Sequence, residues 1–94
     1  MKIKVLKVER FYDWKEGAIR ASEVVVAIGE AIEFVYRLGD DDKPRLVSKT
    51  KYGVSILTRD TFYLRSEVWE KLNKIVWAIF SERRPVEFIQ GKLF

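Results

Sequence analysis

The chain has 94 residues, of which 48% are hydrophobic and 34% are charged, and its formal net charge is +4. This length and composition predict one domain over residues 1–94 and exclude a long disordered tail. The absence of both Cys and His excludes Cys/His zinc sites, Ser-His-Asp triads, Cys-His dyads and disulfide frameworks.

Composition also indicates the setting in which the protein works. One Asn and one Gln stand beside many Lys, Arg, Glu, Ile and Val, and this depletion of thermolabile residues predicts a thermophilic source. The longest apolar run, residues 75–80, is far shorter than the roughly 20 residues that span a bilayer. No signal-type apolar segment follows the charged start of the chain. We therefore expect a cytoplasmic protein with no membrane partner.

The first strand and a short helix are expected near the N-terminus. Residues 2–8 alternate apolar side chains with lysines, which predicts a strand with a basic outer face. Residues 9–16 are predicted to form a short helix, because Phe11 and Trp14 have helical spacing and Gly17 is a natural stop.

Residues 18–38 carry two competing patterns. Apolar residues recur at a helical period, but the β-branched run at 24–26 and the apolar alternation over 32–38 favour strands. We therefore expect two strands that are broken near Gly29.

The middle of the chain is predicted to be a meander of strands. Residues 39–44 contain Gly, three Asp and Pro, which indicates a loop between antiparallel strands. Residues 45–51 alternate in polarity and predict the next strand. After a bend at Gly53, residues 54–58 and 61–65 are expected to be extended.

The clearest helix is expected over residues 67–82. Ser66 is a good N-cap, a wide apolar stripe follows it, and Pro85 ends the segment. Residues 86–89 are candidates for an edge strand. Within the helix, Ile75 to Phe80 is apolar on nearly all sides, which predicts a homodimer or tetramer formed through this helix. The alternative is a helix buried within one chain.

Together these elements predict an α+β fold. It consists of an antiparallel sheet of about four strands, with a short N-terminal helix and a long C-terminal helix packed on one face. If Phe34, Tyr36, Leu46 and Leu64 face the helices, alternation sends basic and aromatic residues to the open face. These residues are Arg37, Arg45, Lys49, Lys51, Tyr63 and Arg65.

Positive charge concentrates in residues 43–65. This segment holds six Lys and Arg against Asp60 alone, whereas residues 1–42 carry seven bases against nine acids. The same segment contains Tyr52, Phe62 and Tyr63. Cations that displace counterions from phosphates, together with rings that stack on bases, are typical of surfaces that bind single-stranded nucleic acid. The alternative is that these bases only keep the surface soluble.

Signals for catalysis are weak. Asp40, Asp41 and Asp42 offer oxygen ligands for Mg²⁺, but consecutive side chains in a loop do not converge on one ion. The chain has no Glu-x-Lys of the nuclease type and no glycine-rich phosphate loop. We therefore expect no enzyme activity, no metal and no cofactor.

Three segments carry a resemblance to a known family. The stretch Lys49 to Tyr63, with Phe11 to Gly17 and Phe34 to Arg37, resembles the archaeal ThermoDBP-related single-stranded DNA-binding proteins. The resemblance covers most of the chain and implies a homo-oligomeric binder of single strands without an OB-fold. The segment Ser66 to Leu72 also resembles the start of the helix in positive-cofactor transcriptional coactivators, which bind single strands as well.

The sequence therefore predicts sequence-independent binding of single-stranded nucleic acid, with DNA preferred to RNA as the partner. Lys and Arg would contact phosphates, and Tyr or Trp would stack on bases. The alternative is a protein-interaction or scaffold module with no nucleic-acid role. The candidate binding residues are Arg37, Arg45, Lys49, Lys51, Tyr52, Arg59, Tyr63, Arg65, Tyr12 and Trp14.

Overall fold

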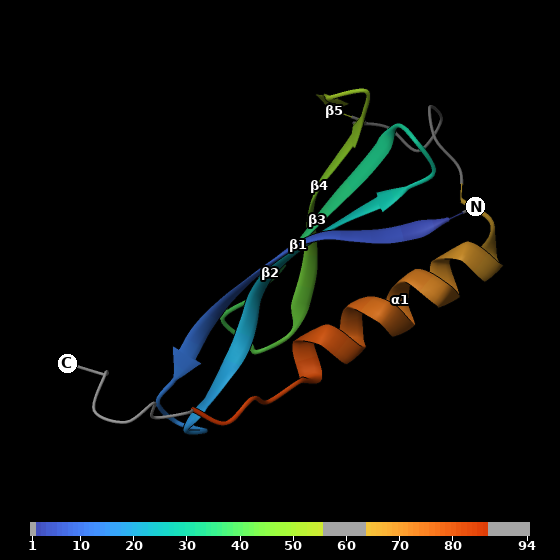
Figure 1. Ribbon diagram of the computed structural model, residues 1–94. Coiled ribbons are helices and arrows are strands. Elements are labelled where there is room, and N and C mark those ends of the chain that lie inside the picture. Colours follow the sequence, from blue (N-terminus) through green and yellow to red (C-terminus); the bar gives the residue numbers. More distant parts are fainter. Residues whose placement is uncertain (1, 56–63, 87–94) are drawn as a thin grey trace.

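The chain forms a meander of five antiparallel strands with one helix packed on the sheet, in a computed structural model that describes residues 2–55 and 64–86 (Figure 1). The strands lie in the sheet in chain order, so each one pairs with its neighbour in sequence. The elements are β1 (Ile3–Asp13), β2 (Ala18–Ile28), β3 (Ile32–Leu38), β4 (Pro44–Lys51), β5 (Val54–Ser55) and α1 (Ser66–Ser81).

The core lies between α1 and one face of the sheet. Leu72, Val76 and Phe80 follow one another at four-residue spacing on one side of α1, and all three are buried. They meet a fully buried layer from β2 and β3 that includes Val24 and Phe34. Each fully buried side chain of this size contributes roughly 1.5–3 kcal/mol, so this layer holds the helix on the sheet.

The predicted α+β architecture is confirmed, but the predicted N-terminal helix is wrong. Residues 9–13 continue β1, which pairs with β2 as far as Asp13 opposite Ala18. Only residues 14–17 turn, and Gly17 closes that turn with a φ of +62°. Cross-strand pairing therefore overrides the local helical spacing of Phe11 and Trp14, and that spacing reflects the turn alone.

The long helix is confirmed with a shifted start. Arg65, and not Ser66, occupies the N-cap position, and it makes no side-chain capping hydrogen bond. The Arg65 carbonyl accepts hydrogen bonds from Val68 N at 3.0 Å and Trp69 N at 3.1 Å. After the helix, Arg84 forms an isolated antiparallel bridge with Ile19, so the chain returns to β2.

Three bulges interrupt the pairing of the sheet. They lie between Val5 and Lys7 in β1, opposite the Glu9 to Arg10 step in β2, and between Leu46 and Ser48 in β4. A bulge places one extra residue in a strand and changes which residues face each side of the sheet beyond it. The β4 bulge leaves Val47 without a partner in β3.

Several smaller predictions have mixed outcomes. The strands broken near Gly29 and the bend at Gly53 are confirmed, and the loop expected over 39–44 is confirmed as far as Lys43, since Pro44 begins β4. Of the expected extended segment 54–58, Val54 and Ser55 form β5, and the rest lies outside the described residues. Leu64, Arg65 and Val86 belong to no strand, and the remainder of 61–65 and 86–89 lies outside the described residues.

In the described part of the chain, no helix combines the length and the apolar character that crossing a membrane requires.

Candidate functional site

The turn between β1 and β2 presents Trp14 at one end of the sheet. Asp13 Oδ1 accepts hydrogen bonds from the backbone of Lys15 at 2.9 Å and Glu16 at 3.4 Å, and Gly17 N donates to Asp13 O at 2.8 Å. An Asp side chain that caps the backbone two and three residues later stabilises a tight turn. The turn therefore holds Trp14 outward, where 86% of the residue is exposed.

Arg20 fastens this turn to the loop between β3 and β4. The Arg20 side chain is buried, and its Nη1 donates to Asp13 Oδ2 at 2.8 Å and to Asp42 Oδ1 at 2.6 Å. The hydrogen bond to Asp42 is the main reason that the pKa of Arg20 is raised, and the hydrogen bond from Arg20 is the main reason that the pKa of Asp13 is lowered. Asp42 adopts a left-handed φ of +67°, a conformation that costs a non-glycine residue energy and persists where surrounding contacts impose it.

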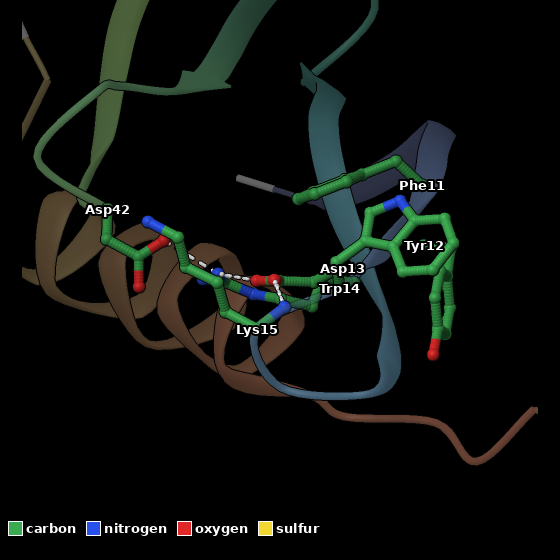
Figure 2. A pocket seen from close by; sticks show the side chains of 7 residues that line it. Phe11, Tyr12, Asp13, Trp14, Lys15 and Asp42 are labelled. Atoms are coloured by element: carbon green, nitrogen blue, oxygen red, sulfur yellow. Dashed lines mark hydrogen bonds and ion pairs between the residues drawn. The ribbon is translucent and has the colours of Figure 1, made fainter.

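Three aromatic residues gather beside this ion-pair network. The Tyr12 and Trp14 rings meet edge to face, with 5.3 Å between their centroids, and the Phe11 ring centroid lies 6.0 Å from the Arg20 guanidinium carbon. Figure 2 shows the three aromatic side chains together on one side and Asp42 on the other, with Asp13 between them. With Lys15, these residues line an open pocket of about 410 Å³. We call it the Trp14 pocket.

The turn between β4 and β5 presents a second exposed aromatic residue. Tyr52 and Gly53 form the two-residue turn, both with positive φ, at +52° and +77°. Tyr52 is 79% exposed, and Lys51 precedes it at the end of β4. Figure 1 shows this turn at the top of the sheet, far from the turn between β1 and β2 at the lower left. We call Lys49, Lys51 and Tyr52 the Tyr52 tip.

The predicted open face carries Arg37 and Arg45, but its charge is compensated. Arg37 and Arg45 are directly opposite each other in β3 and β4, so they share a face. Arg37 Nε donates to Glu23 Oε1 at 2.8 Å, and Arg45 Nη2 donates to Asp41 Oδ2 at 2.8 Å. The hydrogen bond from Arg37 is also the first cause of the lowered pKa of Glu23. This face is therefore a network of paired charges and not the bare basic surface predicted from the sequence.

Lys49 and Lys51 lie on the opposite face from Arg37, contrary to the prediction. Lys49 is paired with Phe34 and Lys51 with Ile32, and both of these partners point into the core. The bulge at Val47 reverses the alternation between Arg45 and Lys49 and is the physical reason for the difference. Both lysines are exposed, and neither takes part in an ion pair with a described residue.

The remaining predicted residues fall elsewhere. Arg65 is exposed at the N-cap of α1 and not on a strand. Arg59 and Tyr63 lie outside the described residues. The structure thus brings Tyr12 and Trp14 together, and it brings Lys49, Lys51 and Tyr52 together at the other end of the sheet.

Sequence reasoning missed the residues that build the Trp14 pocket. Phe11, Arg20 and Asp42 were not expected there, and Asp13 was expected within a helix. The available signals were an Arg in an otherwise apolar strand segment, Ala18 to Ala21, and an Asp four residues before a Gly. The carboxylates of the 39–44 loop separate, because Asp41 bonds to Arg45 and Asp42 bonds to Arg20. Among residues 2–55 and 64–86, no group of acidic side chains is arranged to hold a metal ion.

Comparison of the chain with models of protein families, with curated proteins and with solved structures finds no match.

Proposed function

We propose that this protein binds single-stranded nucleic acid, with DNA preferred to RNA, through the Trp14 pocket and the Tyr52 tip. The observation that carries the proposal is the exposure of Trp14. An indole that is 86% exposed gains little from burial, so its contribution to folding stability is small. Its turn is nevertheless fixed by backbone hydrogen bonds that the Asp13 side chain accepts and by Arg20, which joins two loops. A fixed and exposed ring is suited to stacking on a base.

The Tyr52 tip supports the same function by a different route. Lys49 and Lys51 have no carboxylate partner among the described residues, so their charges are free to contact phosphates. Tyr52 adds a ring that is 79% exposed beside them. Cations that contact the backbone combined with rings that stack on bases give binding to any sequence.

The proposal moves the binding surface away from the open face of the sheet. The guanidinium groups of Arg37 and Arg45 already have carboxylate partners, so contact with phosphate would require those pairs to break. A surface ion pair is worth about 0–1 kcal/mol, so these two arginines should contribute less to binding of phosphate than Lys49 and Lys51.

The Trp14 pocket and the Tyr52 tip lie at opposite ends of the sheet. The 11 residues of β2 measure about 36 Å at roughly 3.3 Å per residue, and this length sets the scale of the separation between the two sites.

Fluorescence anisotropy with a labelled 20-nucleotide dT strand tests the proposal. The expected result is binding whose affinity falls with salt at a log-log slope of about −0.7 per contacted phosphate. Unlabelled single-stranded DNA, RNA and duplex of equal length serve as competitors, and single-stranded DNA should compete best. If the dT strand does not bind at low salt, the proposal is wrong. The resemblance of three segments of this chain to ThermoDBP-related proteins predicts the same result. That resemblance is itself a prediction from the sequence.

A protein-interaction function is the second candidate, and one observation favours it. Trp77 lies on the outward side of α1 and is 49% exposed. Of the apolar run Ile75 to Phe80, the sheet buries Val76 and Phe80, so less apolar surface is left than the sequence indicated. We propose that the remaining surface around Trp77 supports a homodimer. Light scattering at micromolar concentration should give twice the chain mass, and a Trp77→Ser variant should give the monomer mass. A monomeric wild type contradicts this part of the proposal.

A further inference from the structure

The Trp14 pocket contains one carboxylate oxygen that has no hydrogen-bond partner among the described residues. Both carboxylate oxygens of Asp13 have hydrogen-bond partners, because Oδ1 accepts from two backbone N–H groups and Oδ2 accepts from Arg20. Asp42 gives only its Oδ1 to Arg20, and its side chain is 58% exposed. Asp42 Oδ2 is therefore an acceptor available to a ligand that enters the pocket.

The position of this acceptor is fixed. Arg20 is buried and holds Asp42 from one side, while Asp42 N donates to Gly39 O at 3.0 Å from the other. The Arg20 Nε is also buried without a hydrogen-bond acceptor, and Glu16 Oε2 is 3.9 Å away from it. A carboxylate that accepts a hydrogen bond from Arg20 is an acceptor and not a donor, so the pocket presents an acceptor to a ligand.

This chemistry distinguishes the nucleobases. Guanine offers two adjacent donors, N1–H and the N2 amino group. A carboxylate can accept both, one at each oxygen, because Asp42 Oδ2 is open and Asp42 Oδ1 has a second lone pair beside the hydrogen bond from Arg20. Adenine and cytosine each offer one amino group beside an acceptor nitrogen. Thymine and uracil offer a single N–H between two carbonyl oxygens, which a carboxylate repels.

We propose that the Trp14 pocket prefers guanine, which stacks on Trp14 and donates its N1–H and N2–H groups to Asp42. This inference rests on the proposed binding of single strands. Lys15, which also lines the pocket, supplies a donor for the guanine O6. The preference applies to the one base in the pocket, while phosphate contacts elsewhere continue to bind any sequence.

A competition assay with the wild-type protein tests the base preference. Labelled dT strand is displaced by unlabelled 15-nucleotide dT strands that carry one central guanine, hypoxanthine or thymine. The guanine strand should compete at least about fivefold better than the thymine strand, the lower end of discrimination by a bidentate contact to a base. Hypoxanthine lacks the N2 amino group and should lose most of that advantage. Equal competition by all three strands overturns the guanine proposal and leaves the binding of single strands intact.

Substitution of Asp42 tests which group reads the base. In Asp42→Asn, the guanine and thymine strands should compete equally, because the comparison of two strands on the same variant isolates the contact to the base from any change in overall affinity. Asp41→Asn is the matched control, because Asp41 belongs to the same loop but pairs with Arg45 outside the pocket. A guanine preference that survives in Asp42→Asn and is lost in Asp41→Asn overturns the assignment. If no strand binds to the wild type at all, the proposed function fails first, and the two failures are thereby distinguished.

Discussion

The two turns at opposite ends of the sheet each present an exposed aromatic residue, but they hold it differently. Trp14 stands on a four-residue turn that Asp13 caps and that Arg20 joins to a second loop. Tyr52 stands on a two-residue turn in which both residues have positive φ. Its only described hydrogen bond to another segment runs from Tyr52 N to Ala31 O at 2.8 Å.

Under the proposed function, this difference gives the two ends different tasks. In the Trp14 pocket, Arg20 is paired with Asp13 and Asp42, so binding there would depend on stacking and hydrogen bonds more than on charge. At the Tyr52 tip, Lys49 and Lys51 have no carboxylate partner among the described residues, so binding there would depend on charge. The first mode would distinguish bases, and the second would respond to salt.

The largest effect is expected from Arg20→Met, which keeps most of the side-chain volume but removes the charge between Asp13 and Asp42. Breaking a buried pair from one side costs about 3–5 kcal/mol, and the exposure of Asp42 reduces our expectation to about 2 kcal/mol. For a domain of this size, the melting temperature should fall by about 10 °C. Arg45→Met is the control, because it breaks an exposed pair and should shift the melting temperature by less than about 3 °C.

Removal of the Trp14 ring should weaken binding without affecting folding. Trp14→Ala is expected to reduce affinity for single-stranded DNA by about tenfold, within the range for one lost stacking contact. The melting temperature should stay within about 1 °C of the wild type, because the side chain is mostly exposed. A large drop in melting temperature together with unchanged affinity would show that Trp14 is structural.

Removal of charge from the Tyr52 tip should change the response to salt. The double variant Lys49→Ala, Lys51→Ala should flatten the log-log salt slope by about 1.4, if each lysine contacts one phosphate. The double variant Arg37→Ala, Arg45→Ala removes the same formal charge from the paired network and should flatten the slope by less. The reverse order would return the binding surface to the open face of the sheet.

Low pH should destabilise the folded protein, because protonation of Asp13 removes its charge at the turn that carries Trp14. The pKa of Asp13 is lowered in the folded state, so its stabilising effect is complete above its ordinary value of 3.8 and is lost as the pH falls through the folded value. Thermal melts between pH 7 and pH 2 should show that Asp13→Asn is less stable than the wild type at neutral pH. The gap should narrow below about pH 4. A constant gap would mean that the Asp13 charge plays no part.

The smallest effect is expected from Tyr52→Asn. Both turn residues have positive φ, and Asn-Gly is the favoured pair in such a turn. The substitution should therefore stabilise the fold by about 0.5 kcal/mol, while it weakens binding to single strands by removing the ring. Opposite changes in stability and affinity would show that the ring at this position serves binding and not folding.

The sequence was a good guide wherever structure depends on neighbouring residues. The β-branched run at 24–26, the Asp-rich loop and the stripe of α1 all report local preferences, and each element formed where expected. The segment 9–13 was misassigned because its spacing suits a helix, while pairing with residues 18–23 of β2 decides its structure.

The candidate site was less predictable, because its contacts join distant segments. Asp42 reaches Arg20 across 22 positions, and no pattern around either residue indicates the other. The side of the sheet on which Lys49 and Lys51 lie depends on the bulge at Val47. The sequence does not indicate this bulge, because its alternation of polarity continues through Val47 without a break. Tyr12, Trp14 and Tyr52 could be selected from the sequence as candidate binding residues because they are aromatic. The residues that surround them in the structure could not be predicted.

The bulge at Val47 also determines what a small genetic change could do to this surface. Loss of the one codon for Val47 would remove the bulge and keep the pairing on both sides of it, so Lys49 would stay opposite Phe34. A slip of the strand that pairs Val47 with Val35 would instead place Lys49 opposite Glu33, on the side of Arg37. The side of the sheet that carries these lysines is therefore insensitive to deletion of the bulged residue and sensitive to the register of β4.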